Sequence, residues 1–141
     1  MKIAFVGKGG SGKSSTSWLM TKTIEDMGIS VLAIDADHNM DLTSNLGVDP
    51  EKTPLMHKTD KDFLEAVGLT ENDRLLNLAL QENTASLFTL EPLDAYTEKI
   101  VTKISPRLSL INIGLGSPDL LFQTKCAHAL SGPLKFYLGP L

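Results

Sequence analysis

A glycine-rich stretch near the N-terminus constrains this chain more than any other feature. It runs from Gly7 to Ser15 and reads G-K-G-G-S-G-K-S-S. The part from Gly7 to Ser14 matches the pattern G-x-x-x-x-G-K-[ST], between an apolar run and a segment with helical periodicity. A strand, a glycine loop and a helix start, in that order, predict a loop that binds phosphate. The alternative is a glycine-rich turn that holds no ligand.

The chemistry of such a loop assigns a role to each kind of residue in it. Glycines let backbone N–H groups turn toward phosphate oxygens, and the following helix adds about half a positive charge at its N-terminus. Lys13 would reach the β- and γ-phosphates, and the Ser14 hydroxyl would ligate Mg²⁺. The candidate nucleotide-binding residues are Gly7, Lys8, Gly9, Gly10, Ser11, Gly12, Lys13, Ser14 and Ser15.

Composition narrows the class of protein. The 141 residues are enough for one domain with a core, and we treat residues 1–141 as a single unit. A net charge of −4 gives no electrostatic footprint for nucleic acid, and no apolar run approaches the roughly 20 residues of a membrane span. The single cysteine excludes an internal disulfide and fits a reducing compartment, so we expect a cytoplasmic protein.

Hydrophobic patterns predict an α/β fold. We expect a buried strand at residues 2–7, a helix at 13–27 with Met20, Ile24 and Met27 facing inward, and a second buried strand at 31–34. Two strands joined by a helix form a parallel sheet with a right-handed crossover. Further along, the patterns predict helices at 41–46, from 60, from 70 and at 93–104, and a third strand at 108–113.

Two acidic residues end the second predicted strand. Asp35 and Asp37 are separated by one residue, so on an extended chain their side chains point the same way. The carboxyl ends of parallel strands form the ligand side of such sheets. These carboxylates could hold Mg²⁺ through water and orient an attacking water. The alternative for both is turn and helix-cap chemistry.

Lys8, directly after the first glycine, makes the motif K-G-G-x-G-K-S. Here the sequence resembles the deviant Walker A P-loop ATPases, which include the nitrogenase iron protein, the Min and Par positioning ATPases, arsenite-pump ATPases and nickel-insertion ATPases for carbon monoxide dehydrogenase. The resemblance is closest to the nickel-insertion branch. It implies ATP as ligand, a homodimer in which Lys8 reaches the partner's nucleotide, Asp37 orienting the hydrolytic water, and Asp35 nearer the magnesium. His38 departs from the family, which usually has proline there.

A second implication of the resemblance concerns Cys126 and His128. In the family, cysteines after the third strand bind a metal or cluster on the two-fold axis. Cys126-x-His128 from each of two subunits would supply four ligands for a shared Ni²⁺ or Zn²⁺, for delivery to a metalloenzyme client. The alternatives are a buried apolar cysteine and a structural histidine.

The family's next acidic motif, D-x-x-G or D-x-x-x-G, does not occur in the sequence. In relatives the strand that carries this Walker B motif inserts between the first and second strands. We therefore expect the N-terminal portion of a P-loop ATPase domain, an incomplete sheet of about three strands, and self-association as a homodimer, domain-swapped in one arrangement. Whether the chain hydrolyses ATP stays open. The alternatives are a hydrolysis-deficient nucleotide-binding fragment and a Par/Min-type positioning ATPase, whose basic DNA-binding surface this acidic chain lacks.

Overall fold

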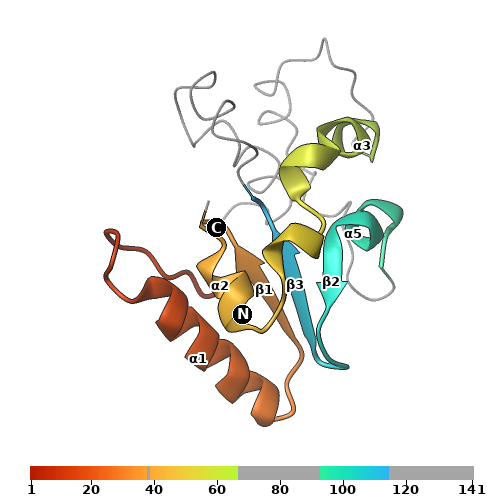
Figure 1. The fold of residues 1–141 in the computed structure, drawn as a ribbon. Helices are drawn as coiled ribbons and strands as arrows, with labels where there is room; N and C mark the ends of the chain where they lie inside the picture. Colours follow the sequence, from red (N-terminus) through yellow and green to blue (C-terminus); the bar gives the residue numbers. More distant parts are fainter. Residues whose placement is uncertain (38, 67–92, 115–141) are drawn as a thin grey trace.

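The computed structural model describes residues 1–37, 39–66 and 93–114. Their centre is a mixed sheet of three strands in the order β1-β3-β2 (Figure 1). Strand β1 (Val31–Asp35) pairs in parallel with β3 (Leu108–Asn112), with Val31 opposite Leu108 and Asp35 opposite Asn112. Strand β2 (Val101–Lys103) pairs antiparallel with β3 on its other side. The predicted α/β class and the strands at 31–34 and 108–113 are confirmed.

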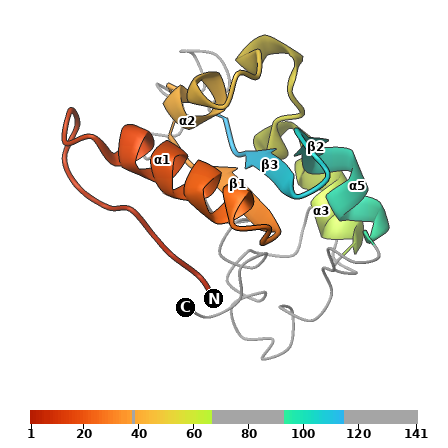
Figure 2. The same ribbon diagram turned by 90° about the horizontal axis from the view of Figure 1, so that it is seen from below.

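Helices cover both faces of this sheet. Helix α1 (Lys13–Asp26) and the short α2 (Asp41–Asn45) pack against each other and against β1. Figure 2 shows them on the opposite side of the sheet from α3 (Asp60–Ala66) and α5 (Ala95–Ile100). Two 3-10 helices, η1 (Pro50–Lys52) and η2 (Met56–Thr59), connect α2 to α3.

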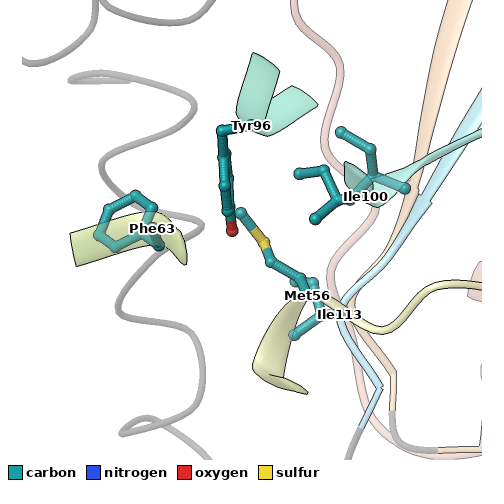
Figure 3. Close-up of a cluster of buried hydrophobic side chains, with 6 residues drawn as sticks. Met56, Phe63, Tyr96, Ile100 and Ile113 are labelled. Carbon is teal, nitrogen blue, oxygen red and sulfur yellow. The ribbon is translucent and has the colours of Figure 1, made fainter. Parts of the chain in front are cut away.

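Alternation along β3 divides the core into two clusters, because successive strand residues face opposite sides of a sheet. Leu108 and Leu110 pack with Ala33 and Leu42 under α2. The other face carries the larger cluster, which consists of Met56, Phe63, Tyr96, Ile100, Ile111 and Ile113. Figure 3 shows the Tyr96 ring between Phe63 and Ile100; its centroid lies 5.5 Å from that of Phe63 in an edge-on arrangement.

The predicted strand at residues 2–7 is wrong for this structure, in which these residues are not in the sheet. Ile3 is 47% exposed and Val6 88% exposed. A strand is held by hydrogen bonds to a neighbour, and among the described residues no strand pairs with the free edge of β1. An apolar run predicts a strand only where the fold also places a partner beside it.

Helix α1 confirms the predicted helix but not its buried face. Met20 is 39% exposed and Met27 69% exposed, whereas Thr21 is the residue of α1 that is buried. The face of α1 that packs inward is therefore not the face that carries Met20 and Met27. Without residues 2–7 in the sheet, α1 packs mainly against β1 and α2, and much of its apolar surface stays exposed.

The predicted helix at 93–104 is too long at its C-terminal end. Tyr96 and Ile100 are buried on α5 as their spacing predicts, but the chain turns into β2 at Val101. The β-branched residues Val101 and Thr102 favour a strand. The turn before β3 is closed by the Ser105 hydroxyl, which accepts hydrogen bonds from the N–H groups of Arg107 and Leu108 at 3.1 and 3.0 Å.

Several expectations lie outside the described residues: the helix from residue 70, His38, Cys126 and His128. In the described part of the chain, no helix has the length and apolar character needed to cross a membrane.

Candidate nucleotide-binding site

The glycine loop ends in a helix start that is open to an anion. Helix α1 begins at Lys13, and its N-cap residue, Gly12, makes no side-chain cap. Gly12 and Gly10 have φ values of 80° and 74°, the left-handed conformation that glycine adopts without strain. The first N–H groups of a helix have no acceptor within the helix, so those of Lys13, Ser14 and Ser15 can bind a ligand.

The side chain of Lys13 folds back over the loop. Its Nζ donates a hydrogen bond to the carbonyl oxygen of Lys8 at 3.1 Å. The same carbonyl accepts from the Ser11 N–H at 3.3 Å, so Lys8 O is the point around which the loop turns. This arrangement places an ammonium group beside the backbone donors, as a phosphate would require.

Space around the loop also fits a ligand. A Cβ built on Gly9, Gly10 or Gly12 would meet no atom within 4 Å, so the backbone there is open to approach. At Gly7 a Cβ would lie only 2.9 Å from the Ser11 hydroxyl oxygen, so a larger residue would distort the loop. Lys8 has an exposed side chain, and Ser14 is half-buried at the second position of α1.

The residues present therefore fit a magnesium nucleotide. The backbone donors and Lys13 suit phosphate oxygens, and the Ser14 hydroxyl is the kind of oxygen ligand that Mg²⁺ takes alongside water and phosphate. Once bound, the ion would neutralise charge on the phosphates.

Asp35 and Asp37 lie at the carboxyl end of β1, which Figure 1 shows at the same end of the molecule as the glycine loop. Asp35 is only 2% exposed. Its Oδ2 accepts hydrogen bonds from the Thr43 N–H at 2.8 Å and the Thr43 hydroxyl at 2.7 Å, and its Oδ1 accepts from the Asp37 N–H at 3.2 Å. Asp37 is half-buried, and its Oδ1 accepts from the Asn39 N–H at 3.1 Å.

The buried polar residues around Asp35 were not predicted from the sequence. Thr43, Thr53 and Asn112 are at most 8% exposed, and Asn112 donates to the hydroxyls of Thr43 and Thr53 at 3.2 and 3.3 Å. The sequence carried one signal of this cluster. In the strand Leu-Ser-Leu-Ile-Asn, Asn112 follows Leu108 and Leu110 on one face that is otherwise apolar. Among the described residues, no group of three or more His, Cys, Asp or Glu could hold a metal ion.

Fold and loop together define a P-loop nucleotide-binding chain. A profile of the CobQ/CobB/MinD/ParA nucleotide binding domain matches residues 3–119. The chain belongs to this family. The resemblance read from the motifs is thereby confirmed.

Among curated proteins, the chain is 46% identical over 92 residues to the carbon monoxide dehydrogenase accessory protein CooC of Rhodospirillum rubrum, a match that covers 65% of this chain and 32% of that protein. It is 42% identical over 69 residues to an uncharacterized ATP-binding protein of Methanocaldococcus jannaschii, covering 48% and 24% of the two chains. A second ATP-binding protein of that organism is 37% identical over 81 residues, covering 53% and 32%. The chain thus spans about a third or less of the length of these relatives. No solved structure matches it.

Proposed function

We propose that this chain is part of a dimeric ATPase that couples ATP hydrolysis to the assembly of a metallocentre, such as the insertion of nickel. The observation that carries the proposal is the loop itself: the Lys13 ammonium lies beside an uncapped helix N-terminus. The similarity to the CooC accessory protein supports the metallocentre branch of the family. The formal net charge of −4 disfavours the positioning branch, which needs a basic surface to bind DNA.

In this proposal each candidate site residue has a defined role. The loop from Gly7 to Ser15 binds the phosphates, and Lys13 offsets the charge that develops on them. Ser14 is the magnesium ligand, and Asp35 would approach the ion only through water because its carboxylate already accepts three hydrogen bonds. Asp37 orients the attacking water.

Two further roles in this proposal involve a second copy of the chain. The exposed Lys8 side chain is free to extend beyond its own loop and reach the nucleotide of a second copy. Cys126 and His128 of two copies would hold the transferred Ni²⁺ or a Zn²⁺ between them, with a metalloenzyme as client.

Sedimentation velocity with and without Mg-ATP tests this proposal. We expect ATP to convert monomer into dimer in the wild type and in Lys103→Ala, which removes an exposed lysine on β2. Lys8→Ala should keep its affinity for ATP and lose the dimer. A mass that does not respond to ATP, or equal loss in both variants, would contradict the dimeric ATPase. Binding without turnover in the wild type would favour the hydrolysis-deficient alternative, which the missing D-x-x-G motif supports.

Metal titration tests the remaining part. The wild type should bind Ni²⁺ or Zn²⁺ at one ion for two chains, and Cys126→Ser should not. Equal binding by both chains would remove the shared site from the proposal.

A further inference from the structure

The loop between β1 and α2 is held in a strained conformation. Met40, which precedes α2, has a φ of 53° and is the one non-glycine residue with positive φ in the described part of the chain. Such a residue persists only where its surroundings enforce it. Its N–H donates a hydrogen bond to the Asp37 carbonyl oxygen at 3.2 Å, so its conformation depends on how Asp37 is held.

Asp35 supplies this restraint at both ends of the loop. Its Oδ1 accepts the Asp37 N–H at the beginning, and its Oδ2 accepts the Thr43 N–H in the first turn of α2 at the end. The carboxylate therefore caps α2 from eight positions upstream in the chain. Asp37 is itself the first of these two anchor points, so its backbone is held directly by the Asp35 carboxylate.

The orientation of Asp35 is in turn fixed by a directed chain of hydrogen bonds. The Thr43 hydroxyl gives its proton to Asp35, and the Thr53 hydroxyl gives its proton to the Pro50 carbonyl at 2.8 Å. Both hydroxyl oxygens can therefore only accept from Asn112, whose amide nitrogen has two protons to donate. Counting these donor protons therefore fixes the direction of each hydrogen bond among Asp35, Thr43, Thr53 and Asn112.

The amide oxygen of Asn112 adds a cost to this cluster. It is buried and has no hydrogen-bond partner among the described residues. A leucine of similar size would avoid this cost, because an unsatisfied buried acceptor is destabilising. The asparagine is useful here for the two protons it directs at Thr43 and Thr53.

We propose that Thr43 and Asn112 are positioning residues, which act through Asp35 to hold the β1–α2 loop in the conformation that presents Asp37. This role rests on the proposed function, in which Asp37 orients the attacking water. This positioning role is separate from metal binding by Asp35. It depends on hydrogen bonds alone, because Thr43 and Asn112 carry no charge.

Thr43→Val in the full chain tests the proposal, because valine keeps the shape and removes the hydroxyl. We expect affinity for Mg-ATP to stay near the wild-type value while the turnover rate falls by about 10- to 100-fold, the cost of a misplaced catalytic group. Amide exchange at Asp37, Asn39 and Thr43 should become faster. Thr43→Ser, which restores the hydroxyl, should recover both turnover and slow exchange. Asn112→Leu provides a second variant with the same expected direction.

Thr97→Val is the matched control. Thr97 is also fully buried, and its hydroxyl also donates to an aspartate, Asp94, that caps the N-terminus of its own helix, α5. It should lower thermal stability without changing turnover or exchange in the β1–α2 loop.

Three results would overturn the positioning role: wild-type exchange and turnover in Thr43→Val, equal loss in Thr97→Val, or no rescue by serine. Should the wild type fail to bind or hydrolyse ATP, the proposed function fails. Amide exchange in the same variants then still decides whether Thr43 and Asn112 hold the loop.

Discussion

At the scale of single residues, the loop before α1 depends on glycines for its shape. Gly12 ends the loop with a φ of 80°, and a Cβ there would meet no other atom. The position therefore tolerates the volume of an alanine but not its conformational preference. This separation allows the backbone requirement of the loop to be tested without a steric clash.

Gly12→Ala and Gly47→Ala form a matched pair. Gly47 follows α2 with a φ of 79° and also has open space at its Cβ. Each variant should lose about 1–2 kcal/mol of unfolding free energy in urea titrations, because alanine is strained in the left-handed region. Only Gly12→Ala should also lose affinity for ATP, by about tenfold or more if similar strain must be overcome to form the site. Equal ATP affinity in the two variants would show that the loop backbone does not bind the phosphates.

Residue chemistry near the motif could be predicted from the sequence because it is local. The left-handed glycines, the helix start at Lys13 and the strand ending in Asp35 all follow from neighbours in the chain. The partners of Asp35 could not be predicted, since Asn112 lies 69 positions from the Thr43 hydroxyl to which it donates. Contacts of that kind depend on the register of β1 against β3.

At the scale of elements, residues 1–7 contain an apolar run but lie outside the sheet. Val6→Ala should change the unfolding free energy by no more than about 0.5 kcal/mol, because the side chain is 88% exposed. Ile111→Ala, in the middle of β3 and fully buried, should cost about 2–5 kcal/mol. Chemical denaturation measures both. A cost at Val6 comparable to that at Ile111 would place the segment in a packed sheet after all.

The C-terminal end of α1 is tied to the β2–β3 turn by Glu25. Its carboxylate accepts from the Lys22 ammonium and from the Ser105 hydroxyl. These two hydrogen bonds, that from Lys22 first, lower the pKa of Glu25 below its usual value. A carboxyl group with a lowered pKa in the folded state stabilises the fold above its unfolded pKa, near 4.3. That contribution is lost as the pH falls through the lowered value.

Glu25→Gln should therefore be less stable than the wild type near neutral pH, and the difference should shrink as the pH falls below about 4. Glu51→Gln, at an exposed position in η1, is the control and should follow the wild type. Thermal unfolding followed across this pH range gives the comparison. A difference that grows on acidification would be opposite in sign to the prediction.

Element boundaries show where sequence patterns fail physically. Helical spacing at Tyr96 and Ile100 continues to Ile104, yet the chain leaves α5 at Val101. Pairing of Val101 with Ile111 and of Thr102 with Leu110 stabilises a strand there, and this pairing is a property of the tertiary fold.

At the scale of the whole molecule, the sheet ends in two edge strands, β1 and β2. Both strands pair with β3 on one side, and among the described residues no strand pairs with the outer side of either. Exposed apolar side chains gather on residues 1–7 and on α1, which packs against β1; they include Ile3, Val6, Trp18, Leu19 and Met27. The α/β class was predicted from hydrophobic patterns, and the incomplete sheet from the missing D-x-x-G or D-x-x-x-G motif. Which strand would be left out of the sheet could not be read from hydrophobicity, because all candidate strands are apolar.

The central claim is that the loop from Gly7 to Ser15 binds ATP, and calorimetric titration of Mg-ATP into the full chain tests it most directly. Wild type and Lys103→Ala should show saturable binding with the same affinity, since Lys103 lies on β2. Lys13→Ala should show little or none, because it removes the ammonium beside the helix N-terminus. Absence of binding in the wild type, or unchanged binding in Lys13→Ala, would contradict the account.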